Sequence, residues 1–394
     1  MRRELGRARP AVNALGAHTH VAALRRAAYT AGRARMGLPH GWTIGTMPMD
    51  MDAGNMLAAP HVEIMREAAD PRARRRTYAA LDLGTNNCRL LIARQANGGF
   101  YVVDSFSRVV RLGEGLLASG RLSDASQDRA LAALAVCAGK IRRREVTLAR
   151  SVATEACRRA ANGAKFIERV YEETGIALDV ITPAEEARLA VLGCQALIEP
   201  RVEDAIVFDI GGGSTELVLV RPGPGGHAEV RAWVSLPWGV ISLAETEPMN
   251  IQTREGRLDA YARSHRRVSH ALAAFAARIA PMLDGRMPQL LGTSGTVTTL
   301  AALQMGLPAY DRTIVDGCYV PAPAMREIGM MLAGKSAAER ALLPTIGADR
   351  ADLIVAGCAI LESILAAFPT ERLRIADRGI REGILRTLIA RDGD

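Results

Sequence analysis

The sequence predicts an α/β fold built from two related halves, and three features lead to this prediction. Apolar, β-branched segments alternate with longer helical segments, and this alternation occurs twice along the chain. Each half contains two strands joined by a short loop with Asp and Gly, at 78–93 and at 207–220. At 394 residues, the chain is also long enough for two domains with substantial cores.

In the first half, a strand–loop–strand unit at 78–94 opens the fold. Ser123 is placed to cap a helix that runs to about Arg144. Thr182 opens a later helix, in which Pro183 takes the first position and Glu185 is expected to complete a capping box. The other elements expected here are a strand pair at 100–112, strands at 146–152 and 177–181, and a helix at 164–173, with the helix from Thr182 ending near Leu197.

The second half begins near Val202 with the hairpin at 207–220, and a long helix is expected over 253–279. The remaining strands are expected at 228–235, 288–291 and 373–375, and the remaining helices after Gly295, at 323–333, at 350–367 and from about Gly379.

Composition restricts the class of protein. Hydrophobic residues make up 49% of the chain, but no run of about 18 apolar residues occurs, so no transmembrane helix and no membrane partner are expected. The six cysteines are scattered without a CxxC pair, which predicts reduced, buried thiols of a cytoplasmic protein.

The net charge of +8 belongs almost entirely to the N-terminal segment. Residues 1–76 hold 13 Arg against six Asp and Glu, which leaves a balance of +1 for residues 77–394. Residues 77–394 therefore lack the excess of positive charge that is typical of proteins that bind duplex nucleic acid. For residues 1–76 we considered a disordered basic arm, an organelle-type targeting segment, and translated sequence upstream of the true start; we favour a disordered tail or a later start.

The loop within 207–220 has the composition of a phosphate-binding site. Its glycines are expected to take positive φ and to aim backbone N–H groups at one anion, and two hydroxyls add donors. Asp209, at the end of the first strand, is placed to hold a divalent cation. A tight hairpin whose glycines serve only the turn is the alternative. The residues expected to bind phosphate are Gly211, Gly212, Gly213, Ser214 and Thr215.

The same pattern occurs in the first half, and this repetition favours the phosphate hypothesis. Asp82 ends a strand and is followed by a loop with Gly84, Thr85 and Asn86, which we expect to bind phosphate. Two such loops, one from each half, can close on one phosphate chain, and their acids can share a cation. Both acids could instead cap turn amides, but the matching context favours the metal role.

With these motifs, the chain resembles the exopolyphosphatase / guanosine pentaphosphate phosphatase family, within the sugar kinase–actin–Hsp70 superfold. The resemblance covers residues 77–388. It rests on DLGTNN at 82–87, TPAEEAR at 182–188, DIGGGSTE at 209–216, GTSGT at 292–296 and DRGIREG at 377–383. It implies two actin-like domains with an interdomain cleft, in the short form without an HD-type metal site. We therefore expect an extension over 1–76, a first domain over 77–189 and a second over 190–394.

The resemblance also assigns a catalytic carboxylate. An acid in the first turn of a helix is expected from the helix dipole alone. The residue pattern by itself therefore assigns Glu185 to the helix cap and indicates no special role for Glu186. The family's catalytic glutamate falls on the second Glu of EEAR, here Glu186. The resemblance likewise implies that Glu216 orients water, although Glu216 could equally be a solvated strand residue.

Two further segments are candidates for anion binding. Arg158 matches the arginine of the family pattern T-x-x-x-R-x-A-x-N and could clamp the terminal phosphate, or form a solvated pair with Arg159. Ser294 and Gly295 open a helix after a strand, so their N–H groups could bind phosphate or only cap the helix. Arg378 stands where the family commonly has Gly, which places the backbone geometry of that turn in question.

These residues predict an enzyme, a phosphoanhydride hydrolase of the exopolyphosphatase type, that needs Mg²⁺ (or Mn²⁺). In this hypothesis Glu186 activates a water that attacks the terminal phosphate of inorganic polyphosphate. The alternatives are hydrolysis of the 5′-γ-phosphate of guanosine pentaphosphate (pppGpp), an ATP-dependent enzyme of the same superfold, and a non-catalytic sensor of (p)ppGpp or polyphosphate. The resemblance also implies a homodimer.

Overall fold

The computed structural model describes residues 76–96, 99–223, 226–249 and 251–393. The hypotheses about the N-terminal segment therefore lie outside the described residues, apart from Arg76.

The first sheet is mixed, with an antiparallel part and a parallel part. Its strands, in spatial order, are β3 (Gly99–Val109), β2 (Asn87–Ala96), β1 (Thr77–Leu83), β4 (Leu148–Ala153) and β5 (Leu178–Val180). The β1–β2 and β2–β3 pairs are antiparallel, whereas β4 lies parallel to both β1 and β5.

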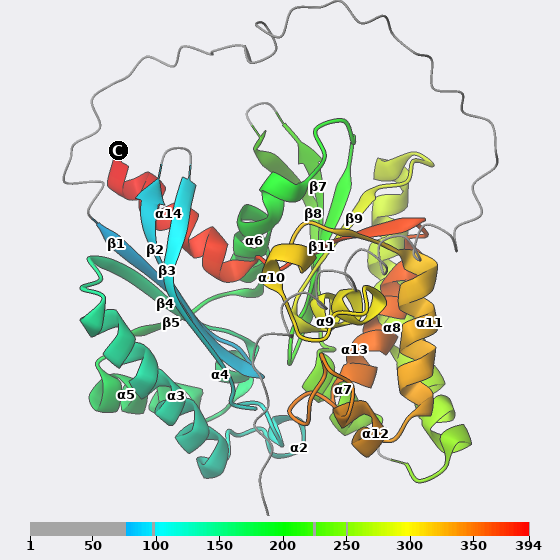
Figure 1. The fold of residues 1–394 in the computed structure, drawn as a ribbon, viewed down its shortest axis with the longest axis horizontal. Helices are drawn as coiled ribbons and strands as arrows, with labels where there is room; N and C mark the ends of the chain where they lie inside the picture. The colour runs from blue at the N-terminus through cyan, green and yellow to red at the C-terminus, as the bar shows by residue number, and fades with distance from the viewer. Residues whose placement is uncertain (1–75, 97–98, 224–225, 250, 394) are drawn as a thin grey trace, which may run out of the picture. The chain divides into compact units, whose positions relative to one another are not determined.

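The second sheet repeats this arrangement. Its strands, in spatial order, are β10 (Tyr319–Pro321), β11 (Arg372–Ala376), β9 (Gln289–Thr293), β6 (Ala205–Ile210), β7 (Thr215–Pro222) and β8 (Ala228–Leu236). Again three consecutive strands, β6 to β8, pair antiparallel, and the first of them, β6, also pairs with a parallel strand, β9. The predicted α/β fold in two related halves is confirmed, with β10 as an extra edge strand (Figure 1).

Helices cover both sheets. They are α2 (Leu116–Ser119), α3 (Asp124–Arg143), α4 (Glu155–Arg159), α5 (Gly163–Thr174), α6 (Pro183–Cys194), α7 (Val240–Thr246), α8 (Arg254–Leu283), α9 (Gly295–Gln304), α10 (Arg312–Val315), α11 (Ala322–Gly334), α12 (Ala337–Ala341), α13 (Ile354–Ala367) and α14 (Ile380–Gly393), with a 3₁₀ turn η2 (Gln195–Leu197) after α6. None of those in the described ranges combines the length and apolar character needed to cross a bilayer.

Helix α6 packs against both sheets and so connects the two halves. Its Leu189 and Ala190 contact the face of the first sheet that carries Tyr78 and Ala80. The other side of the helix, at Ala187, Val191 and Cys194, contacts the second sheet. These residues recur at helical spacing, so one side of α6 packs against the first sheet and another side packs against the second. Helix α14 joins α6 against the first sheet (Figure 1).

The contact between α6 and α14 requires glycine. A Cβ on Gly193 would lie 2.0 Å from the carbonyl oxygen of Gly379, and a Cβ on Gly383 would lie 2.1 Å from that of Leu189. Because both positions face backbone rather than a flexible side chain, no rotamer change would relieve the overlap. The two helices therefore approach at backbone distance.

Most predicted elements are confirmed, and three expectations are wrong. The segment 100–112 is not a strand pair but contains one strand, β3, which runs through Asp104 and Ser105 without a turn; the irregularity in its pairing is a bulge opposite Ile92 and Ala93. The helix predicted at 350–367 begins only at Ile354. Thr182 caps α6 as expected, but the Glu185 side chain does not complete a capping box, since it pairs with arginines instead.

The six cysteines are free thiols, as predicted, and only Cys318 is partly exposed.

The helix contact leads to a stability prediction. Gly193→Ala should destabilise the protein by about 2–4 kcal/mol, because the added methyl overlaps backbone in a packed contact. Gly139→Ala in α3 is the matched control, since its Cβ would meet only Arg143 Nη1 at 3.8 Å, and it should stabilise by roughly 0.5–1 kcal/mol through helix propensity. Urea denaturation of both variants measures the difference; equal effects would contradict the assigned contact.

Candidate active site

The two loops identified in the sequence have the same backbone turn. In the first, the Gly84 N–H donates to the Asn87 carbonyl at 2.9 Å; in the second, the Gly211 N–H donates to the Ser214 carbonyl at 3.0 Å. Each loop follows a strand whose last polar residue is an aspartate. The repeat is therefore one of three-dimensional structure as well as of sequence.

The two hairpins differ in the charge of the residue that lies opposite the aspartate. On the β1–β2 ladder, Asp82 lies opposite Arg89, whereas on the β6–β7 ladder Asp209 lies opposite Glu216. The same scaffold position thus carries a cation in one half and an acid in the other.

The glycines of the second loop allow the two loops to touch. A Cβ on Gly212 would lie 2.8 Å from the Asn86 nitrogen, and one on Gly213 would lie 2.8 Å from Thr85 Oγ1. The expectation of positive φ in these loops is wrong, because neither Gly84 nor any glycine from 211 to 213 takes that conformation. The absence of a side chain is needed here for close approach between the halves rather than for a left-handed backbone.

Both loops line one cavity of about 110 Å³, which we call the loop cavity. It brings together residues from both sheets, from the start of α6 and from the start of α9. The predicted site residues that line it are Asp82, Gly84, Thr85, Asn86, Glu186, Asp209, Gly211, Gly212, Gly213, Ser214, Ser294 and Gly295.

Three predicted residues do not line the loop cavity. The Thr215 hydroxyl is fully buried and donates to the Trp238 carbonyl at 2.7 Å, so it is used within the second half. Arg158 and Glu216 lie behind Glu186: Arg158 Nη1 donates to Glu186 Oε2 at 3.0 Å, and the Glu216 carboxylate accepts from Ser235 at 2.7 Å.

The environment of Glu186 differs from that of its neighbour Glu185. Glu186 is 8% exposed, and burial, the charge of Glu216 and that of Asp82 together raise its pKa well above the ordinary value, against the opposing effect of Arg158. The pKa of Glu185 is instead lowered to about 2, chiefly by hydrogen bonds from Arg188 and Arg150. Of the two acids, only Glu186 lines the loop cavity and has a raised pKa, which makes its carboxylate the stronger proton acceptor.

Arg158 is held by several partners besides Glu186. Its guanidinium donates to Glu155 Oε2 at 2.8 Å and to the Ile181 carbonyl at 2.6 Å. Because these contacts occupy the donors of Arg158, the arrangement fits a residue that positions Glu186 better than one that clamps phosphate directly.

The two aspartates fit a divalent cation. Both line the loop cavity and both are half-buried. Burial and the charge of Asp82 together raise the pKa of Asp209 to about 6, against the opposing effect of Arg89. Burial likewise raises the pKa of Asp82, whose buried Oδ1 has no hydrogen-bond partner in the described part of the chain. No cluster of three or more metal-ligating side chains occurs among the described residues, so a cation would rest on these two carboxylates and on ligand oxygens, as Mg²⁺ commonly does.

Two arginines that sequence inspection did not select converge on the loop cavity. Arg89 Nη2 lies 3.8 Å, and the Arg350 guanidinium carbon 3.9 Å, from the position that a Cβ on Gly295 would take. Both arginines line the loop cavity beside the N-terminus of α9. Arg89 could have been found from the hairpin register, since it lies opposite Asp82; Arg350 belongs to a distant turn and left no such signal.

The segment before α9 is strained. Ser294 has φ of 105° and ψ of 171°, a region that residues with a side chain rarely adopt, and its hydroxyl accepts from the Thr296 N–H. Such strain, on the order of 1–3 kcal/mol, is common at functional sites.

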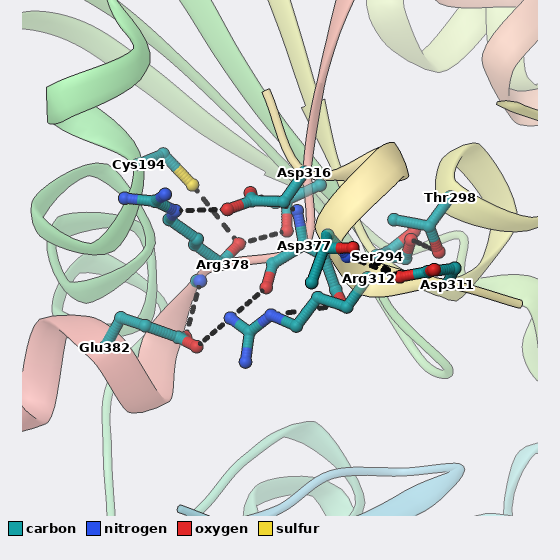
Figure 2. Close-up of polar contacts among 12 residues, drawn as sticks. Cys194, Ser294, Thr298, Asp311, Arg312, Asp316, Asp377, Arg378 and Glu382 are labelled. Carbon is teal, nitrogen blue, oxygen red and sulfur yellow. Dashed lines mark hydrogen bonds and ion pairs between the residues drawn. The ribbon is translucent and has the colours of Figure 1, made fainter. Parts of the chain in front are cut away.

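Arg378, the residue in place of the family glycine, does not require unusual backbone. It is absent from the residues with positive φ, so the turn at 377–379 tolerates a side chain. Its Nε donates to Asp316 at 2.7 Å and its carbonyl accepts from Cys194, as Figure 2 shows. The same carbonyl accepts from the Thr293 hydroxyl at 2.6 Å. The turn is thus held by side-chain contacts.

A second cavity, of about 350 Å³, adjoins the loop cavity and shares Asp82, Arg89 and Arg350 with it. We call it the side cavity. Phe106 and Tyr310 supply its aromatic side chains. Arg312, also in its wall, donates to Glu382 at 2.8 Å (Figure 2).

Comparison with known proteins shows the family to which the chain belongs. The model of the Ppx/GppA phosphatase family matches residues 91–391. The chain belongs to this family. An "Exopolyphosphatase 2" of Mycobacterium tuberculosis (strain CDC 1551 / Oshkosh) is 32% identical over 331 residues, which cover 79% of this chain and 98% of that protein.

Two further relatives extend the comparison. A "Guanosine-5'-triphosphate,3'-diphosphate pyrophosphatase" of Aeromonas salmonicida (strain A449) is 27% identical over 80% of this chain and 60% of its own length. The crystal structure of the Aquifex aeolicus member of the Ppx/GppA family matches with a TM-score of 0.65 and 29% identity, over 81% of this chain and 99% of that one. The predicted family, fold and enzyme class, a phosphoanhydride hydrolase, are confirmed.

The buried aspartates of this Ppx/GppA chain make stability depend on pH. A carboxyl whose pKa is raised by folding contributes stability below its unfolded pKa and loses it as pH rises through the folded pKa. For Asp209 the loss falls between about pH 4 and the raised pKa of about 6 and is on the order of 3 kcal/mol.

Asp209→Asn should therefore be more stable than the wild type at pH 7.5 in the presence of a chelator, and the advantage should vanish near pH 4. Urea denaturation at both pH values measures this. A stability difference that is the same at both would contradict the assignment.

Proposed function

We propose that the protein is a Mg²⁺-dependent exopolyphosphatase, which hydrolyses the terminal phosphoanhydride of inorganic polyphosphate. The observation that carries this proposal is the convergence, in one cavity, of two aspartate-bearing loops with a buried glutamate of raised pKa. Hydrolysis of a phosphoanhydride needs this combination of phosphate binding, charge neutralisation and a proton acceptor.

In the proposed mechanism the terminal phosphoryl group lies between the two loops, where Gly84 and the glycines at 211–213 allow close approach. Glu186 accepts a proton from a water molecule as the water oxygen forms a bond to phosphorus. The bond from that phosphorus to the bridging oxygen breaks, which releases orthophosphate and a chain shorter by one unit. Glu186 then returns its proton to solvent, and no covalent enzyme intermediate is required.

Asp82 and Asp209 would hold Mg²⁺ in this site. The cation, when bound, would neutralise negative charge on the phosphoryl oxygens. The chain's own cations would assist: Arg89 and Arg350, near the start of α9, are placed to contact the phosphoryl group next to the one that reacts.

Polyphosphate is favoured over guanosine pentaphosphate by the relative with the higher identity and nearly complete coverage, which is named an exopolyphosphatase. One observation favours the pentaphosphate as a second substrate. Phe106 and Tyr310 in the side cavity offer aromatic surface for a nucleoside, and that cavity opens from the same catalytic groups.

A comparison of substrates tests the proposal. Purified protein with Mg²⁺ should release phosphate from long-chain polyphosphate with a higher kcat/KM than from guanosine pentaphosphate or ATP. Glu186→Gln should lower turnover by about 10²–10⁴-fold, because it removes the proton acceptor. Glu185→Gln, the neighbouring acid outside the cavity, is the matched control and should retain most activity. Near-normal turnover in a folded Glu186→Gln protein would refute the assigned role.

The pH dependence of kcat/KM gives an independent test of Glu186. Since the base must be deprotonated, kcat/KM should rise with pH through its raised pKa. Arg158 lowers this pKa and Glu216 raises it. Arg158→Gln should therefore move the rising limb to higher pH, and Glu216→Gln should move it to lower pH. Shifts in the same direction would show that the limb reports another group.

A further inference from the structure

A third cavity, of about 580 Å³, adjoins the loop cavity and shares Ser107 and Arg350 with the side cavity. We call it the outer cavity. Asn87 and Arg350 line both the outer cavity and the loop cavity, so the two meet at these residues. From there the outer cavity extends along Arg108, Arg111 and Arg129 of the first half and the turn at 346–350 of the second.

Two of the four arginines in the outer cavity have acidic partners. Arg111 forms a bidentate pair with Asp352, at 2.6 and 3.0 Å, and so connects the two halves. Arg129 donates to Glu114 at 2.7 Å and to the Val110 carbonyl at 2.9 Å. These side chains form the walls of the cavity, and their charges are largely compensated.

The other two arginines have no carboxylate partner among the residues that the structure describes. Arg108 is exposed on β3, and its guanidinium lies 5.2 Å from the centre of the Phe106 ring. Within the described part of the chain, Arg350 donates to the Thr299 hydroxyl, at 2.9 Å. Asp349 is the acid among the lining residues. From the loop cavity outward, the wall of the outer cavity therefore presents two guanidinium groups, those of Arg350 and Arg108, whose charge no carboxylate of the described residues pairs with.

The side cavity differs from the outer cavity in the carboxylates that line it or pair with its arginines. Arg312 is paired with Glu382, and Arg378 is paired with Asp316, both with short hydrogen bonds (Figure 2). Its wall also includes Asp377 and the two aspartates of the loop cavity. Arg89, Arg350 and Arg381 also line the side cavity, so a polyanion there would meet both cations and several carboxylates. In the outer cavity, Asp349 is the one acid among the lining residues, beside the guanidinium groups of Arg108 and Arg350.

We propose that the outer cavity is a distal phosphate subsite, which binds the inorganic polyphosphate chain beyond its reacting end, with Arg108 as its main contact. This inference rests on the proposed function, since it extends the substrate of the same site. Every unit of such a chain carries negative charge, so a guanidinium away from the reacting end still finds a phosphate oxygen. A short substrate that ends within the loop cavity would not reach Arg108.

The subsite predicts a dependence on chain length that Arg108 controls. Affinity for long-chain polyphosphate should exceed that for tripolyphosphate, and Arg108→Gln should weaken the affinity for the long chain about three- to tenfold, as expected for one charged hydrogen bond to phosphate. The loss for tripolyphosphate should be less than twofold. Arg108→Lys, which keeps the charge without the planar fork, should fall between Arg108→Gln and the parent.

The experiment is calorimetric titration with both polyphosphates, in a Glu186→Gln background so that the ligand is not consumed. Arg142→Gln is the matched control, because Arg142 is also an exposed arginine, on α3, and does not line the cavity. It should leave both affinities unchanged. Urea denaturation of each variant confirms that folding is intact.

The outcomes separate this inference from the proposed function. Equal weakening for both ligands, no weakening for either, or equal affinity of the parent for both would overturn the distal subsite. A wild-type protein that does not hydrolyse polyphosphate, but binds long chains through Arg108, would refute the proposed function and leave the subsite in place.

Discussion

The backbone of the second loop, at Gly212 and Gly213, lies directly against Thr85 and Asn86 of the first loop, at distances that exclude a side chain. Each loop is the turn of a hairpin in a different sheet, so this contact joins the two halves at the ends of their central strands. Asp82 and Asp209 consequently line the same cavity, where burial raises the pKa of both and the charge of Asp82 adds to the rise for Asp209. Two such acids cost free energy unless a cation or a proton joins them.

Helix α6 adds the third acid to this pair. Because its two sides pack on different sheets, its N-terminus is held at the boundary of the halves, and the Glu186 side chain enters the loop cavity from there. The glycine contacts with α14 determine how closely α6 can approach. Burial then distinguishes Glu186 from Glu185, although the two are adjacent in the same helical turn.

The repeated scaffold does not produce a symmetric site. The hairpin position opposite each aspartate carries Arg89 in one half and Glu216 in the other. Arg89 lowers the pKa of both aspartates, whereas Glu216 raises that of Glu186. In the proposed mechanism, one half therefore supplies a cation for phosphate, and the other supplies an acid that makes the proposed proton acceptor more basic. This division of charge between equivalent positions allows a duplicated fold to carry an asymmetric reaction.

By itself, the sequence determined the α/β fold in two halves, the two aspartate-bearing loops and the elements that carry them. These features depend on local patterns: strand alternation, turn residues and capping by Ser123 and Thr182. Only the tertiary structure shows that Glu186 rather than Glu185 is buried, and that Gly212 and Gly213 are needed because the two loops touch there. It also shows that the Thr215 hydroxyl is used within the second half, in a hydrogen bond to the Trp238 carbonyl. It also brought Arg89 and Arg350, which are far apart in the sequence, close to the same residue, Gly295. Burial and charge proximity depend on how distant segments pack, and a local pattern of residues carries no record of that packing.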